Sequence, residues 1–340
     1  MRLVLSCLSM VLVWGLTAPA AFAGIVLAGG LFSGRVDRWD TATNTLTTFS
    51  DIFGQTGSAP GIVGMAYNPV TNRVLVAGRF TGTIYELNST TGAVVGQHTS
   101  SGLNQPAGLA VDASGNVYVA NNGGNTLTRF NSSFTSETTI VLPNLGVGDN
   151  LPSGVAVNSS GKVIISTFAG AGVLVYDPST GVTSSFNATN PVANGLATVD
   201  SSDAVYVGGA AFSNSVTKFD ASGAIVGGVT IDSSLLPPPP QSFTSPDFTS
   251  PSGVSIDGSG NLLVAALGRT NPFSPGDNFQ NNGGLFLFDS TGALMTSRVQ
   301  TTPYTSVMYF SAVPEPSSML AAACGLAGAS LLRWRRKVKG

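Results

Sequence analysis

The chain of 340 residues contains one histidine, His98, and this limits the chemistry that its side chains can support. A zinc site needs three or four His, Cys or carboxylate ligands. A serine triad needs a histidine that an acid orients beside a nucleophile, and no serine here lies in a G-x-S-x-G elbow. We therefore interpret His98 as a loop-tip residue, and the sequence predicts neither a catalytic residue nor a set of metal ligands.

Polar side chains gather instead in loops rich in glycine, serine and proline, which we take as the candidate ligand face. Two of these loops, 232–251 and 268–284, are long insertions, and the first contains the tetraproline 237–240. Loops longer than ~12–15 residues are uncommon unless they are functional or disordered. If the fold is a ring, the insertions could form a lip over one side of its central opening. The alternative is that they are tolerated surface insertions. The candidate ligand-face residues are Arg79, His98, Asn121, Asn125, Asp149, Arg269 and Asp277.

A repeated segment predicts the fold that must position these loops. Each copy is a short apolar strand, a turn of Asp, Asn, Ser or Gly, and a strand of β-branched or aromatic residues, as in GLAVDASGNVYVANN. A further strand, turn and strand follow each copy. Such a four-stranded unit of ~40–50 residues is typical of a β-propeller blade. The glycines that begin the copies, 44, 46, 41 and 58 residues apart, are Gly64, Gly108, Gly154, Gly195 and Gly253.

The two ends of the repeated region each supply part of one blade. Residues 24–49 contain a second, third and fourth strand without a first, while 303–312 resembles an orphan first strand. Pairing these ends would close the ring and leave no open edge. The predicted fold class is therefore all-β, a six-bladed β-propeller over 24–312 closed by its N- and C-terminal strands. Packing of both blade faces on neighbouring blades accounts for a charged content of 9%.

Most carboxylates have a structural explanation in this scheme. An aspartate at the start of a turn accepts a hydrogen bond from the backbone amide two residues on. We assign this role to the aspartates that end first strands or begin the turn after third strands. They are Asp112, Asp200 and Asp257 in the first group, and Asp40, Asp177, Asp220 and Asp289 in the second.

The recurring pattern P-x-G-[LV]-x-[VI]-[DN]-x-[ST]-G-[NK]-[VL] resembles NHL-type and gluconolactonase-like six-bladed propellers over about 24–312. Such folds host lyases, lactonases and plain binding scaffolds, so the resemblance implies a fold and leaves the function open. Similarity to gluconolactonase-like enzymes implies a divalent metal held by carboxylate and amide side chains near the central channel. The residues available for it are Asp149, Asn121, Asn125 and Asn194. Since the inner strands begin with Gly and Ala, we expect no cofactor, with a divalent metal as the alternative.

Charge and cysteine content exclude further classes of function. Residues 24–312 hold 9 basic and 16 acidic side chains, a net charge of −7, and no cluster of basic residues suited to a phosphate backbone. We therefore expect no nucleic-acid partner. Both cysteines, Cys7 and Cys324, fall outside this region, so the propeller is expected to contain no disulfide.

Residues 1–23 are typical of a secretory signal peptide. Arg2 supplies the positive start, 3–16 is apolar, and Ala21 and Ala23 form a small-x-small cleavage site. Gly24 is then the expected first residue of the mature chain.

The segment 313–340 combines VPEP at 313–316, a short apolar run and RWRRK at 333–337, and these parts in this order resemble a PEP-CTERM sorting tail. Its 14 uncharged residues 319–332 fall short of the ~20 that span a bilayer, so we expect a short transmembrane helix acting as a weak anchor with the propeller outside. The resemblance implies that an exosortase reads the tail in a Gram-negative, exopolysaccharide-producing bacterium. The implied sorting motif is Val313, Pro314, Glu315 and Pro316, and the implied retention signal is Arg333, Arg335, Arg336 and Lys337.

Two functional hypotheses follow from these observations. The first is an exported propeller that acts as a binding or structural module at the cell surface or in the extracellular matrix, with an exosortase-type processing enzyme and extracellular polysaccharide as partners. It would contact the membrane through its C-terminal helix before processing. The alternative is an exported metal-dependent hydrolase or lyase, lactonase-like, on the same propeller.

Overall fold

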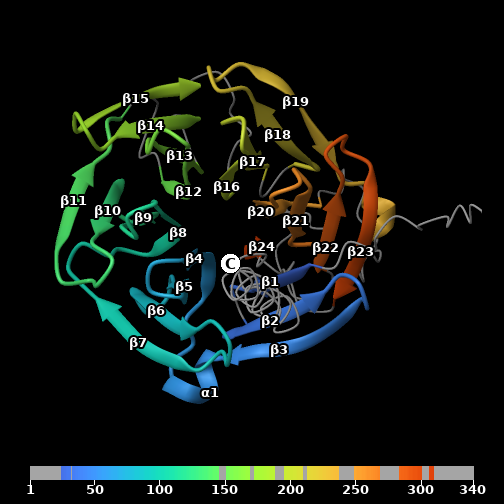
Figure 1. Ribbon diagram of the computed structural model, residues 1–340, viewed down its shortest axis with the longest axis horizontal. Coiled ribbons are helices and arrows are strands. Elements are labelled where there is room, and N and C mark those ends of the chain that lie inside the picture. Colours follow the sequence, from blue (N-terminus) through green and yellow to red (C-terminus); the bar gives the residue numbers. More distant parts are fainter. Residues whose placement is uncertain are drawn as a thin grey trace, which may run out of the picture.

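A computed structural model of the chain describes residues 24–31, 33–144, 151–168, 172–187, 195–209, 213–236, 249–268, 283–300 and 306–309. They form six four-stranded antiparallel sheets, arranged as blades around a central axis (Figure 1). The six-bladed β-propeller is therefore confirmed. The predicted signal peptide and C-terminal helix lie outside the described residues. Within these ranges, no helix is long and apolar enough to cross a membrane.

Each blade runs from an inner strand beside the axis to an outer strand at the rim. Blade 1 consists of β24 (Ser306–Tyr309), β1 (Ile25–Gly29), β2 (Arg35–Asp40) and β3 (Thr45–Asp51). Blade 2 consists of β4 (Ile62–Asn68), β5 (Arg73–Gly78), β6 (Thr83–Asn88) and β7 (Val94–Thr99). Blade 3 consists of β8 (Pro106–Val111), β9 (Val117–Asn121), β10 (Thr126–Phe130) and β11 (Glu137–Val141).

Blades 4 to 6 continue the same order around the ring. Blade 4 consists of β12 (Pro152–Val157), β13 (Val163–Thr167), β14 (Val173–Asp177) and β15 (Val182–Asn187). Blade 5 consists of β16 (Ala197–Val199), β17 (Val205–Gly208), β18 (Ser215–Phe219) and β19 (Ile225–Thr230). Blade 6 consists of β20 (Pro251–Ile256), β21 (Leu262–Ala266), β22 (Gly283–Phe288) and β23 (Leu294–Gln300).

Two short helices interrupt the connections between blades. The helix α1 (Ile52–Thr56) follows β3, and the carboxylate of Asp51 caps it by accepting from the Gly54 amide at 2.9 Å. The 3-10 helix η1 (Ser233–Leu235) opens the first of the two long insertions. The next residue, Leu236, is buried between blades 5 and 6, which anchors the start of that insertion to the core.

The last described strand closes the ring. β24 pairs antiparallel with β1, from Gly29 opposite Ser306 to Val26 opposite Tyr309. The predicted closure between the two ends of the repeated region is thus confirmed. The described strand covers residues 306–309 of the predicted segment 303–312, whose other residues lie outside the described ones.

The hydrophobic core consists of six clusters of buried residues, one between each pair of neighbouring blades. Strand β5 shows how alternation fills them. Val74 and Val76 pack against blade 1, while Leu75 and Ala77 pack against blade 3. Because both faces of such a strand are buried, the residues after Arg73 in β5 are continuously apolar and none of them is charged.

The glycines that mark the repeats lie on the inner strands or, for Gly195, just before one, where neighbouring blades approach most closely. A Cβ added to Gly108 would lie 2.5 Å from the carbonyl oxygen of Ser153, and one added to Gly154 would lie 2.5 Å from the amide nitrogen of Ala197. Real Cβ atoms do not approach backbone that closely, so only glycine fits. The repeat is therefore fixed by the crowding at the axis.

The propeller has two distinct faces. On the turn face, short turns join the first strand of a blade to the second and the third to the fourth. On the loop face, connections join the second strand to the third and each blade to the next. The predicted role of the seven turn aspartates is confirmed, since each accepts a hydrogen bond from the amide two residues on, at 2.8–3.0 Å.

We expect these turns to make the fold sensitive to acid. Asp220 and Asp289 each accept from a hydroxyl two residues on, at 2.6–2.7 Å, and these hydroxyls together with backbone amides hold the pKa of each carboxyl below its ordinary value of 3.8. The folded state therefore favours the ionised form. This stabilisation is complete above the ordinary pKa and is lost as pH falls through the lowered pKa.

The D220N/D289N variant should lose melting temperature less steeply than the wild type between about pH 5 and pH 3. Asparagine keeps the turn geometry, as Asn88 and Asn131 do in the equivalent turns of blades 2 and 3. Melting curves followed by circular dichroism test this expectation. Parallel slopes for the two proteins would contradict it.

Candidate functional site

The loop face holds a polar network centred on Arg79, which follows β5. One Nη of its guanidinium donates to Gln105 Oε1 at 3.1 Å and to Asn122 Oδ1 at 2.8 Å. Asn122 in turn donates to the carbonyl oxygens of Leu151 and Pro152, at 3.2 and 3.4 Å. The network thus joins blades 2, 3 and 4 across the loop face. Burial lowers the pKa of Arg79 below its ordinary value.

Asn121 and Asn125 lie on the same face in blade 3. Asn121 is fully buried at the end of β9, where its amide donates to Thr126 Oγ1 at 3.0 Å and Thr128 Oγ1 at 2.8 Å. Asn125 donates to the carbonyl oxygen of Leu142 at 3.2 Å. Both amides therefore brace the loops around Arg79.

His98 lies within the outer strand β7, so its prediction as a loop-tip residue is wrong. Its Nε2 is 2.9 Å from Glu86 Oε2 on the neighbouring strand β6. Its ring stacks on Phe134 of blade 3, with ring centroids 3.9 Å apart and an interplanar angle of 7°. The pairing of β7 with β6 continues through His98, and this pairing is what extends the strand into the predicted loop.

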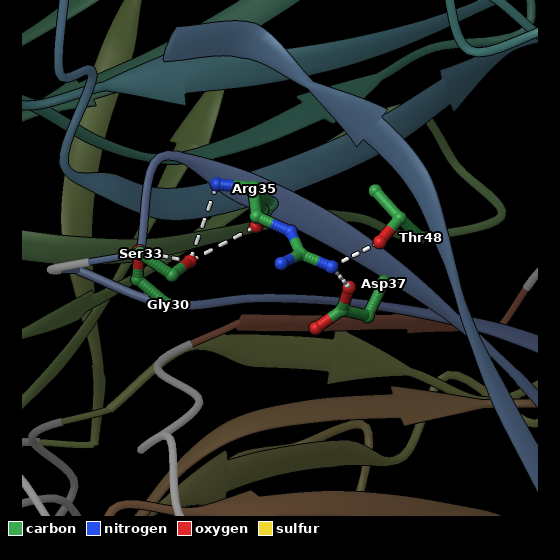
Figure 2. Close-up of polar contacts among 5 residues, drawn as sticks. All are labelled: Gly30, Ser33, Arg35, Asp37 and Thr48. Carbon is green, nitrogen blue, oxygen red and sulfur yellow. Dashed lines mark hydrogen bonds and ion pairs between the residues drawn. The ribbon is translucent and has the colours of Figure 1, made fainter. Parts of the chain in front are cut away.

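A second polar cluster lies in blade 1 (Figure 2). Arg35 begins β2, and its guanidinium contacts Asp37 Oδ1 at 3.4 Å and Thr48 Oγ1 on β3. The Ser33 hydroxyl donates to the carbonyl oxygens of Gly30 and Arg35, at 3.3 and 3.0 Å, and shapes the loop before β2. Because Arg35 is half exposed, this pair contributes about 0–1 kcal/mol to stability.

The inner strands enclose a small cavity of about 30 Å³ on the axis, enough for one or two water molecules. None of the residues that line it is charged. They are Gly64, Met65, Gly108, Leu109, Val155, Leu196, Ala197 and Val254. The described part of the axis therefore offers backbone and apolar side chains to a ligand.

Several predicted site residues lie outside the described residues. These are Asp149, Asn194, Arg269 and Asp277, together with the cleavage-site residues Ala21 and Ala23 and the sorting motif. Among the residues that are described, no group of three or more His, Cys, Asp or Glu side chains is placed to hold a metal ion. Gly24, the expected first mature residue, donates its amide to Thr41 Oγ1 at 3.1 Å.

Four partners of Arg79 and His98 were not predicted from the sequence. Gln105 and Asn122 lie in loops of the loop face, and their connection to Arg79 depends on three blades meeting. Glu86 and Phe134 are brought to His98 by strand pairing and by the packing of blade 2 on blade 3. The asparagine pair at 121–122 was the one local sequence signal of the network around Arg79, since two adjacent amide side chains stand at the end of a buried strand.

Two family matches agree with the sequence motifs. The PEP-CTERM protein-sorting motif matches residues 312–337, and the NHL repeat matches residues 103–130, which include β8, β9 and β10. Both resemblances are thereby confirmed, so the chain carries an NHL repeat in blade 3 of its propeller and a sorting motif after β24. No curated protein sequence matches the chain.

Solved structures share its fold at low sequence identity. Virginiamycin B lyase from Staphylococcus aureus has a TM-score of 0.55 and 13% identity, over 82% of this chain and 81% of that chain. A catalytically inactive histidine-to-alanine variant of this lyase, with quinupristin, has a TM-score of 0.53 and 12% identity, over 84% of this chain and 86% of that chain. A chain of a nidogen/laminin complex has a TM-score of 0.61 and 13% identity, over 84% of this chain and 97% of that chain. Identities this low establish the fold alone.

Proposed function

We propose that this chain is an exported propeller that acts as a binding or structural module at the surface of a Gram-negative bacterium. The observation that carries the proposal is the sorting motif at residues 312–337, which begins within three residues of the end of β24 at Tyr309. A signal peptide over 1–23, a propeller over 24–312 and a sorting tail over 313–340 are the parts that this function requires.

The position of the motif suits removal of the tail by an exosortase-type enzyme. Since β24 is the last strand of the ring, a cut near Pro314 or Glu315 leaves every blade complete. A cut before Ser306 would instead remove the inner strand of blade 1. Processing at the motif thus releases a closed propeller, with a short apolar segment and the basic residues left in the membrane.

A lyase activity is the weaker alternative for this chain. The inactive variant of the similar lyase replaces a histidine. The single histidine of this chain, His98, lies on an outer strand, where it contacts Glu86 and Phe134. This placement favours binding over histidine-dependent catalysis.

The loop face is the proposed binding surface, with extracellular polysaccharide as the proposed ligand. It presents the Arg79 network next to exposed aromatic rings, and aromatic rings with nearby amides offer stacking and hydrogen bonds to sugars. Exposed phenylalanines in its described connections are Phe53, Phe80 and Phe168.

Fractionation of cells that process such tails tests both parts of the proposal. The wild-type propeller should be recovered, without its tail, with the extracellular polysaccharide. The P314A/E315Q/P316A variant should stay uncut in the membrane fraction. The R79A variant should be cut normally but pass into the medium, because its loop face has lost its central cation.

A matched control for R79A is R35A, which removes an arginine whose contacts lie within blade 1. It should be processed and retained like the wild type. Normal processing of the motif variant would contradict the sorting proposal. Retention of R79A at the wild-type level would contradict the binding surface.

A further inference from the structure

Both chain ends of the propeller leave from the turn face. β24 runs from Ser306, opposite Gly29, to Tyr309, opposite Val26 at the beginning of β1. The chain therefore enters β24 on the loop face and leaves it on the turn face. At the other end, Gly24 and Thr41 of the β2–β3 turn exchange hydrogen bonds of 3.1 Å, which fixes the start of the propeller on that face too.

The exit point is also central. β24 is an inner strand that lies beside the inner strands β4 and β20 of the two neighbouring blades (Figure 1). A tether attached near the axis pulls on the middle of the turn face and not on its rim.

We propose that the turn face is the surface that the anchored propeller presents to the lipid bilayer, with the loop face directed outward. This inference rests on the proposed function of the tail as a membrane anchor. Only residues 310–318 separate Tyr309 from the apolar run, so the turn face stays within ~30 Å of the bilayer. Strands of five or six residues place the loop face ~20 Å farther away.

Electrostatic attraction does not produce this orientation. Among the described residues, the turns and the strand residues next to them carry basic side chains at Arg73 and Lys162. The acidic side chains there are Asp40, Asp112, Glu137, Asp177, Asp200, Asp203, Asp220, Asp257 and Asp289. An anionic bilayer repels such a face, so the tether alone must hold it near the membrane and salt should let it come closer.

Energy transfer to lipid dyes tests the orientation. The chain 24–340 with Cys324→Ser is placed in vesicles that carry headgroup acceptors, and one donor dye is attached through A113C or A59C. Both alanines are exposed. Ala113 lies in the β8–β9 turn on the turn face, and Ala59 in the connection from α1 to β4 on the loop face. With ~20 Å between the faces, we expect transfer about twofold higher from the A113C chain.

The controls separate this inference from the proposed function. The chain 24–312 should not bind the vesicles, and salt should raise transfer from the A113C chain in anionic vesicles. Equal transfer from the two anchored variants, or higher transfer from A59C, would overturn the orientation and leave the anchor intact. Failure of 24–340 to stay with the vesicles, or equal binding of 24–312, would overturn the anchor and the orientation together.

Discussion

Removing β24 lowers the melting temperature of the propeller by about 10 °C. The strand contributes the four pairs with β1 and packs beside β4 and β20, which together are worth about 5 kcal/mol if each hydrogen bond contributes ~1 kcal/mol and packing adds the rest. In a domain of this size, 1 kcal/mol shifts the melting temperature by roughly 2 °C. The loss also exposes the edge of β1, which favours aggregation.

Two chain lengths test this expectation. The fragment 24–312 keeps β24 and should melt like the tailed chain, while 24–305 should melt about 10 °C lower. The V307P/M308P variant of 24–312 lacks two adjacent backbone N–H donors. Because successive N–H groups of a strand point to opposite sides, one of the two belongs to the ladder with β1, and its loss weakens the closing pair. Equal melting temperatures for 24–312 and 24–305 would show that the ring does not depend on its closing strand.

The G108A variant should lose about 3 kcal/mol of unfolding free energy, because inserting a methyl group into packed structure costs about 1–3 kcal/mol, and more where backbone must move. The new Cβ would lie 2.5 Å from the Ser153 carbonyl oxygen and 2.7 Å from the Gly154 Cα. Both are backbone atoms of the next blade. Relief therefore requires two inner strands to separate at the axis.

Gly258 provides the matched control, because a Cβ there meets nothing within 4 Å and its φ is not in the left-handed region. The G258A variant should be neutral or slightly stabilised. Urea unfolding of both variants, followed by tryptophan fluorescence, gives the comparison. A G108A midpoint equal to that of G258A would mean that the inner strands are looser than the structure shows.

Features that repeat along the chain were the ones that sequence reasoning could predict. Each blade is encoded in a contiguous stretch, so its strands, its turn aspartates and its glycine recur at regular spacing. The shared first blade could be predicted as well, because the missing strand at one end had a counterpart at the other. The helix α1 was missed because it is five residues long and occurs in one connection only.

The candidate site was harder to predict because its contacts are unique to single blades. Arg79 meets Asn122 across 43 residues of sequence, and Asn122 meets Leu151 across 29. No local pattern encodes these pairs. His98 was misplaced for the same reason, since a polar segment rich in glycine and serine predicts a loop until the pairing with β6 is known.

The direction of β24 has a mechanical consequence for a tethered propeller. A force applied through the tail pulls β24 along its own axis, out of the turn face. The hydrogen bonds to β1 run perpendicular to the strands, so this force loads all of them at once in shear. A force perpendicular to the strand would instead peel it from one end and break the bonds one at a time. Because the chain leaves β24 along the strand's own axis, a load on the anchor is resisted by the whole ladder.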